Sequence, residues 1–136
     1  MAITGSCLCG AVRYEISGRL LDAGNCHCSM CRRIHGAAFA TYASLRPGSF
    51  RWMCGEELVT HYDSSPNMGR MFCSLCGSIL GATEGGQIDS ITLGTVEGDP
   101  DIRPRSHIFV GSKAAWHEIS DGLPQFEEWP PGDGWT

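Results

Sequence analysis

Residues 73–77 read "CSLCG" and residues 7–10 read "CLCG", so that two cysteine pairs far apart in the chain are each followed directly by a glycine. A tight turn around a metal directs backbone N–H groups at the thiolates, and such a turn favours glycine because glycine adopts positive φ without strain. Four cysteines in two turns of this kind are the usual arrangement for structural zinc. The two pairs therefore predict one tetrahedral site that ties the first strand to a much later one. Its ligands are Cys7, Cys9, Cys73 and Cys76.

A second cysteine group lies between the two pairs, in "NCHCSMCRR" at residues 25–33, and no glycine follows it. Its members are Cys26, Cys28 and Cys31. Three thiolates on Zn²⁺ leave one coordination position open, which is how catalytic zinc is generally presented. His27 alternates with its neighbours and points to the opposite side if this stretch is extended. We therefore expect water or a substrate atom as the fourth ligand.

The eighth cysteine, Cys54, leaves an alternative open. Eight cysteines divide evenly into four and four, so Cys54 could supply a fourth sulfur and close the second site. Against this, Cys54 lies in the strand-like run "FRWMCGEEL", where a buried free cysteine is an ordinary small hydrophobic residue. We favour that second interpretation, which leaves two zinc ions per chain on seven cysteines.

Composition limits the classes of function. A chain of 136 residues is one domain by the usual length expectation, covering residues 1–136. The formal net charge of −5 and the lack of a basic run argue against nucleic acid or an anionic membrane as partner. The N-terminus shows no export signal and no stretch is long and apolar enough to span a bilayer, so we expect a cytoplasmic setting. In a reducing compartment, eight cysteines favour metal binding over disulfides.

The pattern of short alternating or β-branched runs separated by turn residues predicts a mostly β domain with little helix. The runs are "AVRYEI", "AFATYASL", "FRWM", "ELVTHY", "SIL", "SITLGTV" and "HIFV". One or two helical turns are expected at "SMCRR", where Ser29 can cap the helix and Cys28 and Cys31 share a face. The last stretch, residues 123–136, is proline- and tryptophan-rich and predicts an ordered loop packed on the body.

Four segments in this order and spacing closely resemble the glutathione-dependent formaldehyde-activating enzyme family, from about Gly5 to Phe126. They are "GSCLCGAVRYEISG", "CHCSMCRRIHGAAFATYASL", "RMFCSLCGSIL" and "HIFVGSKAAWHEISDGLPQF". The resemblance implies a β-tent-like fold built from short antiparallel strands around zinc knuckles. It also implies a structural zinc on the four cysteines and a second zinc on the three, in agreement with the glycine argument. Cys54 falls outside the family pattern.

The chemistry that follows is that of a carbon–sulfur lyase. A thiol such as glutathione is ionised on coordination to Zn²⁺, and its sulfur adds to an aldehyde such as formaldehyde. Beside the catalytic cysteines, His35 could move a proton, although a histidine satisfied by backbone hydrogen bonds is common. Arg32 and Arg33 could bind glutathione carboxylates or simply form a solvated helix end. The alternative function is a non-enzymatic module that captures a small thiol or a partner cysteine, with zinc mainly structural.

Overall fold

The computed structural model describes residues 2–131, and over this range the chain forms short strands with little helix, so the expected mostly β, β-tent-like fold is confirmed. The strands are β1 (Ala2–Ser6), β2 (Arg13–Ser17), β3 (Asp22–Cys26), β4 (Ala40–Ser44), β5 (Phe50–Cys54), β6 (Val59–Ser65), β7 (Met68–Cys73), β8 (Ile79–Glu84), β9 (Gln87–Thr92) and β10 (His107–Ile108). The helices are α1 (Ser29–His35) and the short 3₁₀ helices η1 (Glu56–Leu58), η2 (Leu93–Thr95) and η3 (Val110–Ser112).

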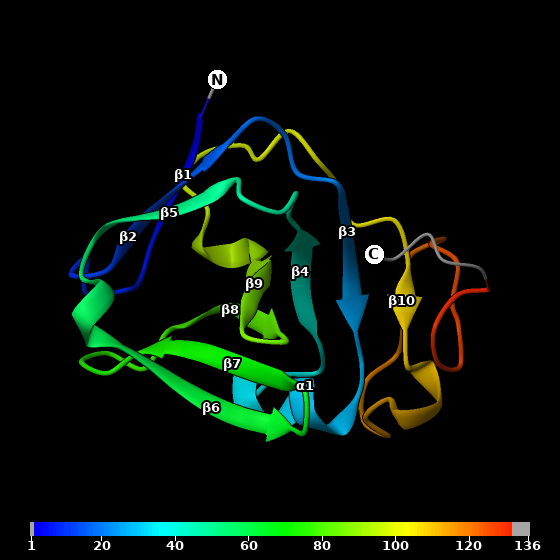
Figure 1. Cartoon of the computed structure of the whole chain (residues 1–136). Helices are drawn as coiled ribbons and strands as arrows, with labels where there is room; N and C mark the ends of the chain where they lie inside the picture. Colours follow the sequence, from blue (N-terminus) through cyan, green and yellow to red (C-terminus); the bar gives the residue numbers. More distant parts are fainter. Residues whose placement is uncertain (1, 132–136) are drawn as a thin grey trace.

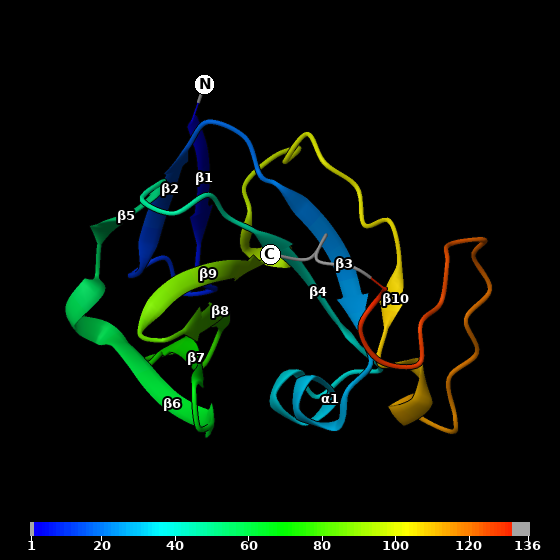
Figure 2. The ribbon, with the colours of Figure 1, turned by 45° about the vertical axis from the view of Figure 1, so that its right-hand side comes forward.

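The strands form two sheets that lie against each other (Figure 1). One is antiparallel with the order β1-β2-β5, and the other has the order β10-β3-β4-β9-β8-β7-β6. Every neighbouring pair is antiparallel except β10 with β3, which is parallel and departs from the expected all-antiparallel pairing. Helix α1 lies at one end of the larger sheet, below β3 and β4 in the rotated view (Figure 2).

The main hydrophobic core lies between the two sheets. Tyr14 and Ile16 of β2 pack in one buried cluster with Ala43 of β4 and Ile91 of β9. All four are fully buried. The Tyr14 hydroxyl also shares a hydrogen bond of 2.6 Å with the Thr95 hydroxyl, so the polar end of this buried ring is satisfied. The apolar faces that the alternating runs predict therefore meet across the sheets.

Three strands were not among the predicted runs: β1, β3 and β7. Strand β3 reads "DAGNC", which has no β-branched residue, yet all five of its residues are buried. Its polar side chains are satisfied by distant partners: Asp22 accepts two hydrogen bonds from Arg105, and Asn25 accepts one from Thr41. Since buried polar groups need such partners, this strand depends on contacts that local patterns do not contain.

Helix α1 begins where expected but with a different cap. Cys28, not Ser29, is the N-cap residue, and its sulfur accepts a hydrogen bond from the Cys31 backbone N–H at 3.3 Å. The helix ends at His35, and the next residue, Gly36, caps it with φ of 60° and donates its N–H to the Arg32 carbonyl. The prediction of a Ser29 cap was therefore wrong, because the cysteine sulfur itself occupies the capping position.

The C-terminal stretch packs on the body as predicted, over the part that the structure describes. Phe126 donates its backbone N–H to the His107 carbonyl and accepts one from Val110. The Trp129 ring meets the Phe109 ring edge-on at 5.2 Å between centroids. Residues 132–136, and with them the end of the predicted loop, lie outside the described range. Over residues 2–131, every helix is too short or too polar to cross a membrane.

Candidate functional site

The four cysteines of the two pairs meet in space, with sulfur atoms all within 4.8 Å of one another. The Cys9 sulfur lies 3.6 Å from that of Cys7 and 3.9 Å from that of Cys73. A tetrahedron with Zn–S bonds of about 2.3 Å has S–S edges of roughly 3.8 Å, so this spacing fits a four-thiolate metal site. The cluster joins the turn after β1 to the turn after β7 and so connects the two sheets.

Both turns have the predicted glycine conformation. Gly10 and Gly77 each have φ of 80°, and nothing lies within 4 Å of where a Cβ would be. Gly77 donates its N–H to the Cys73 carbonyl at 2.8 Å, and Gly10 donates to that of Cys7 at 3.2 Å. The Val12 N–H donates to the Cys7 sulfur at 3.3 Å. These bonds confirm the predicted turns and hold the sulfurs in place.

The second cluster, which we call the three-cysteine cluster, consists of Cys26, Cys28 and Cys31 with sulfurs within 4.8 Å of one another. Cys26 ends β3, Cys28 caps α1, and Cys31 follows one turn later. Two of the three are buried. A soft, thiolate-only donor set suits zinc, and three ligands leave one position open. In the described chain, Cys54 is not part of either cluster.

The three thiols interact so that ionisation concentrates on one of them. Hydrogen bonding from the Cys26 thiol, and then from Cys31, lowers the pKa of Cys28 well below its usual range. The same hydrogen bond to Cys28 raises the pKa of Cys26. In the protein alone, ionisation is therefore favoured at Cys28 over its two neighbours, whereas a divalent cation would allow all three sulfurs to ionise.

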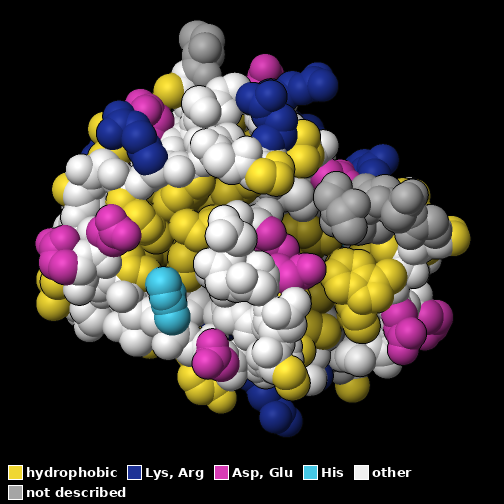
Figure 3. Space-filling view, viewed as in Figure 1, with side chains coloured by type: hydrophobic (Ala, Val, Ile, Leu, Met, Phe, Trp, Pro, Cys, Tyr) yellow, Lys and Arg dark blue, Asp and Glu magenta, His cyan; other side chains and the backbone are white. Residues whose placement is uncertain are grey.

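All three cysteines line a cavity of about 490 Å³, which is within the usual size range of ligand sites. Most of its wall is apolar, with Ile79, Ile91, Ile108 and Phe109 among the contributors. In the space-filling view, hydrophobic side chains fill hollows in this face of the molecule, with acidic side chains beside them (Figure 3). By contrast, none of the four cysteines of the other cluster lines this cavity.

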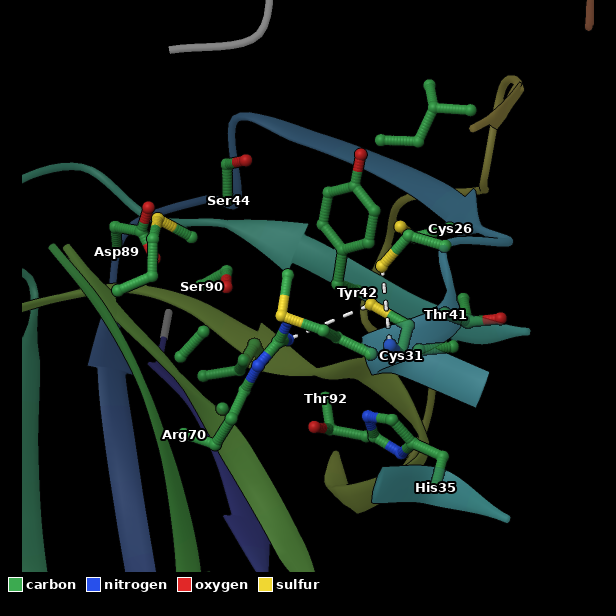
Figure 4. Close-up of a pocket in the computed structure, with 18 of the residues that line it drawn as sticks. Cys26, Cys31, His35, Thr41, Tyr42, Ser44, Arg70, Asp89, Ser90 and Thr92 are labelled. Carbon is green, nitrogen blue, oxygen red and sulfur yellow. Dashed lines mark hydrogen bonds between the residues drawn. The ribbon is translucent and has the colours of Figure 1, made fainter. Parts of the chain in front are cut away.

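The polar groups of the cavity come from several strands (Figure 4). Arg70 of β7 points toward the cluster, with Nη1 3.7 Å from the Cys31 sulfur. Asp89 of β9 is half-buried, and burial together with the nearby negative charge of Glu84 raises the pKa of its carboxyl group. His35, in the last turn of α1, also lines the cavity, and burial lowers its pKa, with a further contribution from Arg70.

His27 points away from the cavity, as the alternation predicts. Its ring is fully buried and its Nε2 lies 2.8 Å from Nδ1 of His107. His107 in turn hydrogen-bonds to the Asp121 carboxylate at 3.0 Å. Phe39 packs against the His27 ring at 4.9 Å between centroids. These contacts give His27 a role in holding the segment between the cysteines, not in filling the fourth position.

The two arginines after Cys31 and the eighth cysteine lie away from the cavity. Arg32 and Arg33 lie on α1 and are not among the residues that line the cavity; Arg32 donates instead to the Ser112 carbonyl at 3.2 Å. Cys54 is exposed, so the prediction that it is buried was wrong. It ends strand β5, at the edge of the smaller sheet, and its thiol donates weakly to the Ala11 carbonyl at 3.7 Å.

Sequence reasoning missed Arg70 and Asp89. Alternation within β7 was the available signal: Met68 and Arg70 share one strand face and both line the cavity, whereas Gly69 and Met71 are buried on the other. The run "MGRMFC" has no β-branched residue and contains a glycine, so local patterns do not mark it as a strand.

Together, the fold and the site define a small β protein with a four-cysteine knuckle and a three-cysteine cluster at an apolar pocket. The chain belongs to the glutathione-dependent formaldehyde-activating enzyme family, which it matches over residues 2–112. It is 31% identical over 131 residues to a Halomonas elongata protein named "Putative glutathione-dependent formaldehyde-activating enzyme", covering 88% of this chain and 82% of the relative. It also resembles the crystal structure of a Rhodobacter sphaeroides protein, with a TM-score of 0.56, 31% identity, and coverage of 71% of this chain and 89% of that one.

Proposed function

We propose that this protein is a zinc-dependent carbon–sulfur lyase, resembling S-(hydroxymethyl)glutathione synthase, that joins or splits a small thiol such as glutathione and an aldehyde such as formaldehyde. One observation carries most of the proposal: three cysteine sulfurs lie together on the wall of a cavity of about 490 Å³. A metal that served only as a staple would need neither an open position nor a cavity. The family and the Halomonas elongata relative support the choice of thiol and aldehyde.

The two clusters have different roles in this proposal. Each cluster binds one Zn²⁺, which makes two per chain; the ligands are Cys7, Cys9, Cys73 and Cys76 for the structural ion and Cys26, Cys28 and Cys31 for the catalytic one. All eight cysteines are free thiols, which accords with a reducing compartment such as the cytoplasm. Zn²⁺ on three thiolates supplies one kind of chemistry, the ionisation of a further thiol that coordinates it.

The reaction is an addition with a proton transfer. The thiol sulfur bonds to the aldehyde carbon while the C=O π electrons move to oxygen, and the proton that left the sulfur ends on that oxygen, giving a hemithioacetal. His35 faces the cavity from α1, and we assign to it the movement of that proton. The apolar walls exclude water from the adduct. Arg32 and Arg33 lie outside the cavity lining and would meet only parts of glutathione that extend beyond it.

The first prediction tests this function with a matched pair of cysteine variants. The zinc-loaded protein should speed the exchange between formaldehyde with glutathione and their adduct above the spontaneous rate, measured by NMR exchange spectroscopy. Cys28→Ser should abolish the gain because it removes one of three ligands; serine is a preferred N-cap residue, so α1 should persist. Cys54→Ser, at an exposed cysteine outside both clusters, should keep the gain.

Binding separates the two candidate functions. Glutathione should bind with release of about one proton near neutral pH, detected by calorimetry in two buffers, and S-methylglutathione should bind much more weakly. Proton-coupled binding without any gain in exchange rate would contradict the lyase and favour a thiol-capture module. Absence of glutathione binding to the zinc-loaded protein would contradict both the lyase and the capture of this thiol.

A further inference from the structure

Arg70 is the sole lysine or arginine among the described residues that line the cavity. It lies in the middle of β7, where it pairs with Tyr62 of β6 and Ala82 of β8 across the sheet. Its guanidinium reaches the three-cysteine cluster, with Nη1 3.7 Å from the Cys31 sulfur (Figure 4). A fixed positive charge is thus held beside the position where chemistry is proposed.

The Arg70 guanidinium has donors that the described residues leave unused. Its Nε is buried and has no hydrogen-bond partner among them. Four other arginines each pair with a carboxylate: Arg13, Arg51, Arg103 and Arg105. A buried donor without a partner is costly, and Arg70 lines the cavity, so a guanidinium kept there is suited to an acceptor on a ligand.

The charged side chains of the cavity indicate which kind of hydrogen-bond acceptor Arg70 can bind. The other charged side chains that line the cavity, Glu84 and Asp89, are acidic, and most of the remaining wall is apolar. An anionic oxygen on a ligand would be repelled by the carboxylates and poorly solvated by the apolar wall. Arg70 is the group that can bind it through charge-assisted hydrogen bonds.

We propose that Arg70 binds an anionic oxygen carried close to the sulfur of the bound thiol or thiol adduct. This rests on the proposed function, because it places the thiol sulfur at the three-cysteine cluster. The oxygen has two possible sources. One is the aldehyde oxygen, which becomes negative as the S–C bond forms and is held until it receives the proton lost by the thiol; the other is a carboxylate of the thiol itself.

The test compares two small thiols of similar length in the zinc-loaded protein: thioglycolate, which carries a carboxylate, and 2-mercaptoethanol, which is neutral. The wild type should prefer thioglycolate by calorimetry. Arg70→Met should reduce that preference about 10- to 100-fold, the loss expected for a hydrogen bond to a charged group, and Arg70→Lys should retain part of it. Arg51→Met removes an equal charge from the exposed surface of β5 and should leave the preference unchanged.

The binding of glutathione to Arg70→Met, together with the exchange rate of this variant, identifies which oxygen Arg70 binds. If Arg70→Met also weakens glutathione binding, Arg70 holds a carboxylate of the thiol. If glutathione binds unchanged and exchange with the formaldehyde adduct slows about 100-fold or more, Arg70 holds the oxygen of the adduct.

The proposal is overturned if Arg70→Met keeps the thioglycolate preference of the wild type. It is also overturned if the variant loses one zinc, measured by mass spectrometry, because Arg70 would then only compensate the charge of the thiolates. Failure of the wild type to bind any of these thiols would instead overturn the proposed function and this inference with it.

Discussion

At the scale of single residues, Asp89 has a carboxyl group that the fold partly buries, although its charged form is more stable in water. Its Oδ1 is buried and has no hydrogen-bond partner among the described residues. Burial, and then repulsion from Glu84, raises the pKa of its carboxyl group. The folded state therefore binds the Asp89 proton more tightly than the unfolded state does, so the contribution of Asp89 to stability falls as pH rises through the folded pKa. Burying the charged form of this carboxyl group in the cavity therefore costs folding free energy.

A stability measurement on Asp89→Asn tests this interpretation. The variant should be more stable than the wild type at pH 7, by on the order of 1 kcal/mol, because the charge that burial disfavours is gone. The gain should disappear near pH 3, where aspartate is protonated in both states. Urea denaturation from pH 3 to 7 measures it.

Asp99 serves as a control, because its pKa is shifted in the direction opposite to that of Asp89. It is exposed, and the hydrogen bond from Arg103 lowers the pKa of its carboxyl group. Asp99→Asn should therefore destabilise the protein at pH 7, with the difference lost as pH falls below the usual aspartate pKa. A destabilised Asp89→Asn at pH 7 would show that burial does not penalise the Asp89 charge.

At the scale of elements, the cysteine turns depend on glycine for a backbone reason. Gly77 has φ of 80° with open space where a Cβ would lie, so a substitution there meets conformational strain and no clash. Gly77→Ala should cost about 1–2 kcal/mol, the usual penalty of the left-handed region for a residue with a Cβ. Urea denaturation of the zinc-loaded protein measures the loss.

Gly94, in η2, is the matched control for Gly77. It also has open space at the Cβ position but no positive φ, so Gly94→Ala should be neutral or slightly stabilising. Equal costs at the two positions would mean that the left-handed conformation is not what requires Gly77.

At the scale of the whole molecule, the two clusters differ in what they connect. The four-cysteine cluster links the β1–β2 turn in one sheet to the β7–β8 turn in the other, and Cys7 and Cys73 pack in a buried cluster with Val12 and Leu80. The three-cysteine cluster connects neighbouring parts of the chain, the end of β3 and the start of α1. Closing the longer loop removes more unfolded-state entropy, so the first cluster should contribute more to folding.

Metal content and thermal melting of cysteine variants test that difference. Cys76→Ser should lose one zinc and its cooperative transition, since the binding energy of a structural zinc, about 10–16 kcal/mol, is comparable to the whole stability of a domain. Cys28→Ser should lose the other zinc and keep a cooperative transition. Cys54→Ala should keep both zincs and melt close to the wild type, because that side chain is exposed. Equal damage from Cys76→Ser and Cys28→Ser would contradict a division into structural and functional sites.

The spacing of the cysteines and glycines determined a large part of this protein without the tertiary structure. Each turn could be predicted because it is local, with two or three cysteines within a few residues and Gly10 or Gly77 to allow the turn. The joining of the two distant pairs followed from the four ligands that a structural zinc requires. The same local character made α1 and most strands predictable, since alternation and β-branching act over a few residues. The side to which His27 points also followed from the period of an extended strand.

Only the tertiary structure decided the remainder, because it depends on contacts between distant segments. Strand β3 is buried although its sequence is polar, since Arg105 and Thr41 supply its partners. Cys54 is exposed although its run is strand-like, because β5 lies at the edge of the smaller sheet. Arg70 and Asp89 face one cavity because β7 and β9 lie on either side of β8, an order set by how the sheet assembles.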